Sequence, residues 1–168
     1  MIKHQEMQDA IYSLGNIPFA FYKNNEIIQN KTFEIFGETN RISNVKFTES
    51  NEVLVINSYP GDSYNYNITK YSAIILNPYH SGTLNTASKN FINFCICANK
   101  KNIPIFVVNL CQGFEYKSKK AFNNLNLIQL PTCSFSAIYI KLWIGLSVDV
   151  GDIVEFIKKP LAGEFLEW

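Results

Sequence analysis

The sequence has a single arginine, Arg41, and no long hydrophobic run. Fifteen basic and fourteen acidic residues give a net charge of +1. Because one arginine cannot form a phosphate clamp of several bidentate guanidinium groups, nucleic acid is not an expected main partner. No stretch approaches the roughly 20 apolar residues of a membrane span, and Glu6 and Asp9 stand where a signal peptide would be apolar. We expect a soluble, cytoplasmic chain that does not contact a membrane.

The four cysteines also lack the spacing of a metal site. They form no C-x-x-C pair, and the histidines His4 and His80 lie far from them in the sequence. On a helix, two residues separated by one other, such as Cys95 and Cys97, point about 200° apart and do not bind one ion together. We expect reduced, mostly buried thiols and neither a metal nor another cofactor. The cysteines are Cys95, Cys97, Cys111 and Cys133.

What the 168 residues do contain is enough apolar material for a globular domain, with 47% hydrophobic and 17% charged residues. Three short apolar runs, 53–56, 73–76 and 105–108, are typical of parallel strands buried on both faces. Residues 86–101, between the second and third runs, have the apolar spacing of a helix. This order predicts a right-handed β-α-β unit and an α/β fold.

Further elements extend this unit toward the C-terminus. We expect a weak strand near 127–130, a helix from Ser134 or Ser136 through Leu146, and a last helix that Asp152 caps and that ends before Pro160. The fold class is therefore a small, Rossmann-like parallel sheet of about four strands flanked by helices, within a domain of residues 52–168.

The N-terminal residues have a different pattern. Apolar positions at helical spacing predict a short helix over 5–14, and residues 18–22 and 26–29 around Asn24-Asn25 predict a β-hairpin. Residues 31–51 are mixed and polar, which indicates a linker. We therefore divide the chain into a helix and hairpin (1–30), a linker (31–51) and the α/β domain (52–168).

Five segments occur in an order that resembles a known family. They are 19–30, 55–61 (VINSYPG), 73–85 (AIILNPYHSGTLN), 101–113 (KNIPIFVVNLCQG) and 141–146 (KLWIGL). The last three resemble the C-terminal domain of the L-asparaginase family, which includes the D subunit of the archaeal glutamyl-tRNA(Gln) amidotransferase. The first two resemble the hairpin that ends the family's N-terminal domain and the strand and turn that follow it.

The catalytic motifs of that family are missing from this sequence. The resemblance implies catalytic threonines in T-G-G-T and G-T-D-T turns and a lysine, all in an N-terminal domain, and the nearest likeness, residues 37–40, follows the hairpin instead. A threonine needs an activating base and an oxyanion site, which the C-terminal domain alone does not supply. We expect residues 1–30 to be a remnant of the N-terminal lobe, and we expect no asparagine hydrolysis by this chain alone.

Ligands of open parallel sheets bind beyond the carboxyl ends of the strands. The resemblance implies that these loops hold a regulatory amino acid in cytoplasmic members and complete a neighbouring subunit's active site in several members. Asn77 stands where some regulated members have arginine, so a charge for a carboxylate is absent. The candidate ligand contacts from the resemblance, together with their loop neighbours, are Asn77, Tyr79, His80, Ser81, Thr83, Asn109, Cys111 and Gln112.

The same loops permit two nucleophile arrangements. His80 and Ser81 with Asp62 form a possible serine-histidine-acid set, although adjacent side chains on an extended segment point apart. The alternative is a polar loop in which Ser81 or Thr83 caps the next helix. Cys111 with His80 is a possible thiol-imidazole pair, and the alternative is a buried thiol at a strand end.

Two further groups of residues also have open interpretations. The basic residues at 117, 119 and 120 either attract an anion or lie on a solvated loop or helix face. Tyr64, Tyr66 and Tyr71 form either an aromatic contact surface or a half-buried cover of the sheet edge.

Three functional hypotheses follow from the resemblance and the missing motifs. The first is a non-catalytic asparaginase-like module for interaction, dimerisation or regulation, whose partner replaces the N-terminal lobe. The second is one subunit of a split amidohydrolase that is active only with a separate N-terminal chain. The third is a sensor of a small amino acid or amide.

Overall fold

The computed structural model describes residues 2–4, 11–13, 20–29, 52–110, 117–161 and 164–165, and the chain divides into two units, 1–39 and 40–168. In the first unit, β1 (Ile2–His4) pairs antiparallel with β2 (Ile11–Ser13), and β3 (Ala20–Lys23) pairs antiparallel with β4 (Glu26–Gln29). The unit's described residues therefore form two short two-stranded sheets.

The prediction of a helix over residues 5–14 is wrong for residues 11–13, the part of this range that the structure describes, because Ile11–Ser13 is a strand. β-branched and aromatic residues such as Ile11 and Tyr12 favour extended backbone. A helix of about ten residues is also marginal in water without tertiary packing. The predicted linker, residues 31–51, lies outside the described residues.

The predicted hairpin is confirmed over residues 20–29. Lys23 pairs with Glu26, and the turn residues Asn24 and Asn25 have φ values of 53° and 62°. Two consecutive left-handed residues form the type I′ turn, whose twist matches that of the strands, and asparagine tolerates this backbone.

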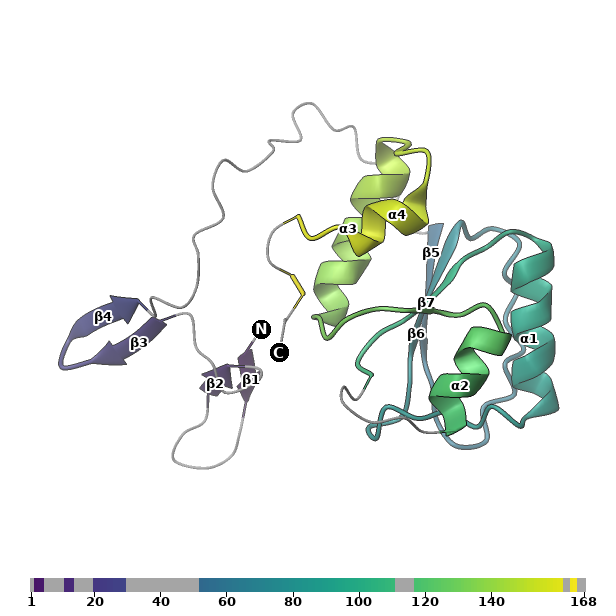
Figure 1. Ribbon diagram of the computed structural model, residues 1–168, viewed down its shortest axis with the longest axis horizontal. Helices are drawn as coiled ribbons and strands as arrows, with labels where there is room; N and C mark the ends of the chain where they lie inside the picture. The colour runs from purple at the N-terminus through teal and green to yellow at the C-terminus, as the bar shows by residue number, and fades with distance from the viewer. Residues whose placement is uncertain are drawn as a thin grey trace. The chain divides into compact units, whose positions relative to one another are not determined.

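The second unit contains the predicted parallel sheet, confirmed with four strands in the order β5-β6-β7-β8 (Figure 1). The strands are β5 (Val53–Asn57), β6 (Ala73–Asn77), β7 (Ile105–Val107) and β8 (Ile128–Gln129). Helices α1 (Lys89–Lys100) and α2 (Lys117–Asn124) lie on one side of the sheet, and α3 (Phe135–Ser147) and α4 (Ile153–Lys158) lie on the other.

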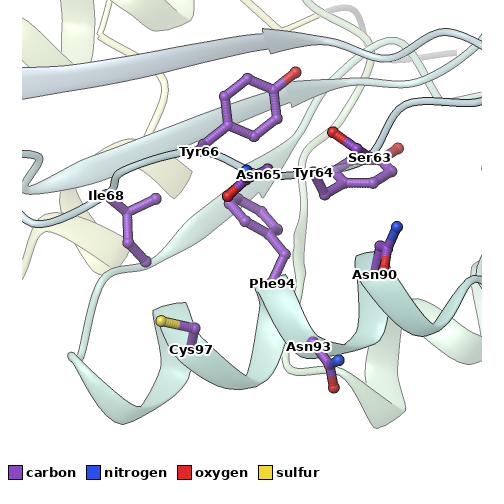
Figure 2. A pocket seen from close by; sticks show the side chains of 9 residues that line it. All are labelled: Ser63, Tyr64, Asn65, Tyr66, Ile68, Asn90, Asn93, Phe94 and Cys97. Atoms are coloured by element: carbon purple, nitrogen blue, oxygen red, sulfur yellow. The ribbon is translucent and has the colours of Figure 1, made fainter.

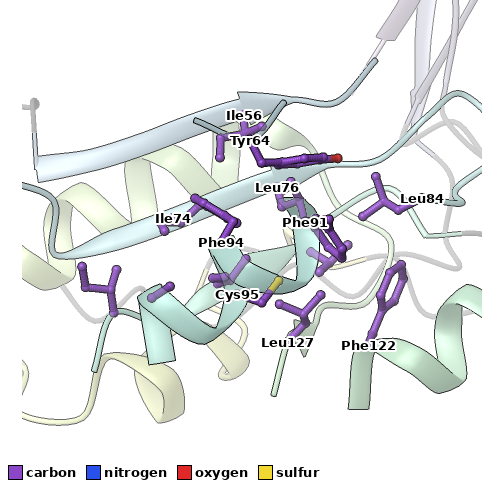
Figure 3. Close-up of a cluster of buried hydrophobic side chains, with 14 of the residues drawn as sticks. Ile56, Tyr64, Ile74, Leu76, Leu84, Phe91, Phe94, Cys95, Phe122 and Leu127 are labelled. Atoms are coloured by element: carbon purple, nitrogen blue, oxygen red, sulfur yellow. The ribbon is translucent and has the colours of Figure 1, made fainter. Parts of the chain in front are cut away.

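Alternate side chains of each strand enter two separate apolar clusters. Ile74 and Leu76 of β6 pack with Phe91 of α1 and Phe122 of α2, and we call this the first face (Figure 3). Ile75 of β6 belongs to the cluster beneath α3 and α4, which we call the second face. Because both faces are covered, the strands are continuous apolar runs in the sequence rather than alternating ones.

The residues that cap the N-termini of α4 and α1 agree with the sequence prediction in the first case and differ from it in the second. Asp152 accepts hydrogen bonds from the Val154 and Glu155 N–H groups at 2.9 and 3.0 Å and caps α4, as predicted. Helix α1 starts at Lys89 and not at residue 86, because Ser88 is its cap and accepts from the Phe91 N–H at 3.4 Å. The prediction that Ser81 or Thr83 caps this helix is therefore wrong.

Within the described ranges, no helix combines the length and the apolar character that crossing a membrane requires.

Candidate functional site

Three asparagines form a hydrogen-bonded row at the carboxyl ends of the strands. Asn77 Nδ2 donates to Asn57 Oδ1 at 3.0 Å, and Asn109 Nδ2 donates to Asn77 Oδ1 at 2.9 Å. The parallel register sets Asn57 beside Asn77, which places both side chains at the same edge. The row ends with the amide nitrogen of Asn57 on one side and the amide oxygen of Asn109 on the other, so it offers one donor end and one acceptor end.

Asn109 reaches this row through an unusual backbone conformation. Its φ is 55°, a left-handed value that asparagine adopts more readily than most residues. The preceding residue, Val108, still donates its N–H to the Leu76 oxygen at 3.2 Å. The chain therefore turns out of the sheet at Asn109.

The loop after β6 is a tight turn built on its own hydrogen bonds. The Gly82 N–H donates to the Tyr79 oxygen at 2.7 Å, and the Tyr79 N–H donates to the Thr83 oxygen at 3.0 Å. The Ser81 and Thr83 hydroxyl oxygens lie 2.8 Å apart and share a hydrogen bond. His80 and Ser81 are exposed, whereas Tyr79 and Thr83 are half-buried.

The loop after β5 is fixed by a buried carboxylate. Asp62, 8% exposed, accepts from the Tyr64 N–H at 2.8 Å and from the Tyr66 hydroxyl at 2.9 Å. Tyr64 has a φ of 51° and donates its hydroxyl to Ser58 Oγ at 3.2 Å. Burial raises the pKa of Tyr64 to about 12, with the Ser58 hydrogen bond opposing it, and burial followed by the Asp62 bond raises the pKa of Tyr66 to about 12. Both phenols therefore stay protonated donors at ordinary pH.

These contacts do not assemble a serine-histidine-acid set. Ser81 pairs with Thr83, and Asp62 is bonded to two tyrosines instead of to His80. Cys111 and Gln112 lie outside the described residues, and with them the proposed pairing of Cys111 with His80. Among the described candidate residues, Asn77 is bonded to Asn109, and Thr83 is bonded to Tyr79 and Ser81, and these contacts include no activated nucleophile.

The loops after β5 and β6 join into one neutral surface. The Ser58 N–H donates to the Asn77 oxygen at 2.9 Å, which ties the two loops together. Tyr59 is 58% exposed, and Asp62 is buried. We define the strand-end surface as Asn57, Ser58, Tyr59, Pro60, Gly61, Asn77, Tyr79, His80, Ser81, Thr83 and Asn109, none of which is a lysine, arginine, aspartate or glutamate.

The other residues with open interpretations also have places in the structure. The basic run lies on the first turn of α2, where Lys117 and Lys120 are exposed. Tyr64 and Tyr66 pack on the first face of the sheet. The Tyr64 ring centroid lies 4.9 Å from that of Phe91, and the Tyr66 ring centroid lies 6.0 Å from that of Phe94. Tyr71 is half-buried, with the Lys70 Nζ 5.2 Å from its ring.

The expected burial of the cysteines holds for two of the three described thiols. Cys95 and Cys133 are buried, and burial raises the pKa of each to about 12. Cys97 is exposed, because it faces away from Cys95 on the same helix. No group of three metal-binding side chains occurs in the part of the chain that the structure describes.

Sequence reasoning missed two polar features. Asn57 belongs to the amide row, and the available signal was an asparagine at or just after the end of each of three strands. Lys141, on the K-L-W-I-G-L helix, is buried and forms an ion pair with Glu164. An isolated lysine in an otherwise apolar helix was the available signal for this pair.

The chain is similar to two known proteins. It is 24% identical over 176 aligned positions, which cover 98% of this chain and 39% of the relative, to the D subunit of the glutamyl-tRNA(Gln) amidotransferase of Methanobrevibacter smithii. Its structure is similar to that of the thermostable L-asparaginase from Thermococcus kodakarensis, with a TM-score of 0.65, 17% identity, and coverage of 98% of this chain and 52% of that one. No family model matches the sequence.

These comparisons confirm the resemblance to the C-terminal domain of the L-asparaginase family, and they confirm the fold class. The chain spans about two fifths of the matched amidotransferase protein and about half of the matched asparaginase.

Proposed function

We propose that the α/β domain is a non-catalytic asparaginase-like module that binds another protein chain through the strand-end surface. The observation that carries this proposal is the composition of that surface, which exposes Tyr59 and neutral amides and no acidic or basic side chain other than His80. The central parts of protein interfaces are depleted in charged residues and enriched in tyrosine. The described hydrogen bonds at the strand ends also include no activated nucleophile.

The first test is self-association of the chain. Sedimentation velocity over a range of concentrations is expected to show a reversible dimer, and Tyr59→Asp is expected to weaken it about tenfold or more, because a charge would be buried in the contact. Ile140→Asp is the matched control, since Ile140 is exposed to 46% on α3, away from the strand ends. A monomer at every concentration, or equal effects of both variants, would contradict dimerisation through this surface.

The partner can instead be an asparaginase-type N-terminal lobe, which would make the chain one subunit of a split amidohydrolase. The longer sequences of the matched relatives support this version. The test mixes the chain with a separately encoded polypeptide that contains T-G-G-T and G-T-D-T turns and measures ammonia release from L-asparagine. Activity only in the mixture, lost with Tyr59→Asp, is expected. No such polypeptide in the genome would remove this version.

The amide row favours a second candidate function, a sensor of a small neutral amide. A carboxamide can accept from the amide nitrogen of Asn57 at one end of the row or donate to the amide oxygen of Asn109 at the other, and no arginine or lysine stands in the row to bind a carboxylate. L-Asparagine and L-glutamine are expected to raise the melting temperature, and L-aspartate is not. Asn77→Leu should abolish the shift, while Asn124→Leu, at an exposed position on α2, should retain it. Equal shifts with aspartate would contradict this candidate.

We also propose a cytoplasmic location for the chain. Three described cysteines, Cys95, Cys97 and Cys133, are free thiols, which persist in reducing compartments.

A further inference from the structure

A groove of about 480 Å³ lies on the first face of the domain, between α1 and the segment Ser63–Ile68. Figure 2 shows the side chains of this segment on one side of the groove and those of α1, among them Asn90 and Cys97, on the other. The groove shares no residue with the strand-end surface, and the Tyr64 hydroxyl, on a side chain that lines the groove, donates to Ser58 of that surface. Its volume falls within the range of about 300–1,000 Å³ that is typical of ligand pockets.

The rims of the groove are neutral and rich in primary amides. Asn90 and Asn93 lie on α1, three residues apart and therefore on one side of the helix, and Asn65 and Ser63 lie on the opposite rim. A primary amide both donates and accepts hydrogen bonds, and so does each residue of a peptide backbone. The rims are thus suited to pairing with main-chain amide groups.

The floor of the groove is apolar and well packed. Phe94 is 5% exposed, Tyr64 is 6% exposed and Ile68 is 3% exposed. The rings of Tyr64 and Phe94 lie 5.8 Å apart. The buried Asp62 holds the Tyr64 N–H and the Tyr66 hydroxyl, so the rim is fixed before a ligand arrives. A fixed site loses less entropy on binding than a mobile one.

The length of the groove matches a short extended segment. From Asn90 to Cys97 the helix rises about 10 Å at roughly 1.5 Å per residue. An extended chain advances about 3.3 Å per residue, so about three residues span this distance. Because no charged side chain lines the groove, a charge on the ligand would lose hydration there without gaining a partner, which favours an uncharged ligand.

We infer that this groove binds an extended, uncharged peptide segment of about three residues, whose main-chain amides pair with Asn65 and Asn90 and whose central apolar side chain packs on Phe94. The partner class is thus a protein with an exposed, neutral, extended stretch. This inference is independent of the function proposed for the strand-end surface.

Cys97 supplies a reporter for the test because it lines the groove and is exposed, whereas Cys95 and Cys133 are buried. The probe is the capped tripeptide acetyl-Ala-Leu-Ala-amide, and the measured quantity is the rate at which iodoacetamide alkylates Cys97 in the full chain, located by mass spectrometry. We expect saturable slowing of the reaction by the probe in the millimolar range, because small neutral peptides bind weakly. Acetyl-Asp-Leu-Asp-amide and N-acetylglucosamine are expected to have no effect.

Variants separate binding from folding. Asn65→Ala and Asn90→Ala are each expected to weaken the protection about tenfold, the loss of a hydrogen-bonded amide pair. Asn124→Ala, on α2, should leave it unchanged. Alanine favours a helix over asparagine, so neither Asn90→Ala nor its control Asn124→Ala should destabilise the fold.

Three results would overturn the inference. One is no protection at about 10 mM probe, where a site with millimolar affinity would be largely filled. Another is protection that Asn65→Ala and Asn90→Ala leave intact. The third is protection by N-acetylglucosamine but not by the tripeptide, which would make the groove a saccharide site. Sedimentation measures self-association and alkylation of Cys97 measures peptide binding, so failure of one proposal is distinguishable from failure of the other.

Discussion

The first face of the sheet is closed by apolar and aromatic side chains, whereas the second face contains a buried lysine. On the first face, Phe91 and Phe122 are fully buried and the polar groups, such as Asp62, lie at the margin. On the second face, Lys141 is 4% exposed, and its Nζ donates to the Ile157 oxygen at 2.8 Å, to the Lys159 oxygen and to the Glu164 carboxylate.

This difference separates two tasks. Lys141 donates hydrogen bonds to carbonyl groups at the C-terminal end of α4 and forms an ion pair with Glu164. These contacts connect the segment around Glu164 to α3. The Lys141 Nζ also lies 4.8 Å from the Phe165 ring centroid. The first face has no such pair among its described residues, and both the groove and the Tyr64–Tyr66 loop lie there. We infer that the second face anchors the fold while the first face positions the candidate binding residues.

Phe91→Ala tests the apolar side of this comparison and should have the largest effect. Phe91 is fully buried on α1, and truncating a core phenylalanine costs about 3–5 kcal/mol of unfolding free energy. Urea denaturation measures the loss. Ile96→Ala on the same helix is the control, because Ile96 is 43% exposed and should cost about 1 kcal/mol or less. Similar losses for both variants would show that α1 is not held by this cluster.

Glu164→Ala tests the polar side. Removing one partner of a buried ion pair costs about 3 kcal/mol, because the other charge is left buried, although the two carbonyls would still accept from Lys141. The double variant Lys141→Met with Glu164→Ala should regain part of this loss, since no uncompensated charge remains. Additive losses in urea denaturation would mean that the pair is not coupled.

The packing of both faces was predictable from the sequence, but their polar contacts were not. The apolar runs that became β5, β6 and β7 are continuous, and only burial on both sides produces that pattern. Asp152 was a recognisable cap because it stands alone before an apolar stretch. In front of α1, several hydroxyl residues compete, and only the folded geometry selects Ser88.

The positions of the candidate site residues were predictable from the sequence, but the contacts between them were not. Asn77 and Asn109 could be placed at strand ends, but their hydrogen bond depends on the register of strands that are 32 residues apart in the sequence. The pairing of Lys141 with Glu164 spans 23 residues and depends on how α4 turns back on α3. Local spacing carries no information about either contact.

Alkaline pH should destabilise the fold through buried ionisable groups on both faces, and more through those on the first face. Burial raises the folded-state pKa values of Cys95 and Cys133 from 9.0 to about 12. Each protonated thiol therefore contributes fully to the free energy of unfolding below pH 9, and this contribution is lost as the pH rises from 9 to 12. At pH 10 the loss is on the order of 1 kcal/mol per thiol. Burial also raises the pKa values of Tyr64 and Tyr66 from 10.0 to about 12, so these two first-face residues lower the free energy of unfolding further above pH 10.

Urea denaturation in reducing buffer between pH 8 and 11 measures this dependence. Cys95→Ala combined with Tyr66→Phe should flatten the pH profile more than Cys133→Ala does, because the first face holds more of the groups that ionise. Equal flattening by the two sets would contradict the assignment.

Substitutions of the helix caps should have the smallest effects on stability, and the two faces have different caps. Asp152 on the second face is charged and accepts two backbone N–H groups at 2.9 and 3.0 Å, whereas Ser88 on the first face accepts one at 3.4 Å. Asp152→Ala should therefore cost about 1–2 kcal/mol and Ser88→Ala about 0.5 kcal/mol, measured by thermal denaturation. Because the Asp152 bonds also gain from the charge at a helix N-terminus, added salt should narrow the gap between the variants. If Ser88→Ala proved the costlier change, the single long bond at the start of α1 would stabilise the fold more than the two charged bonds at the start of α4, and the contrast between the two caps would fail.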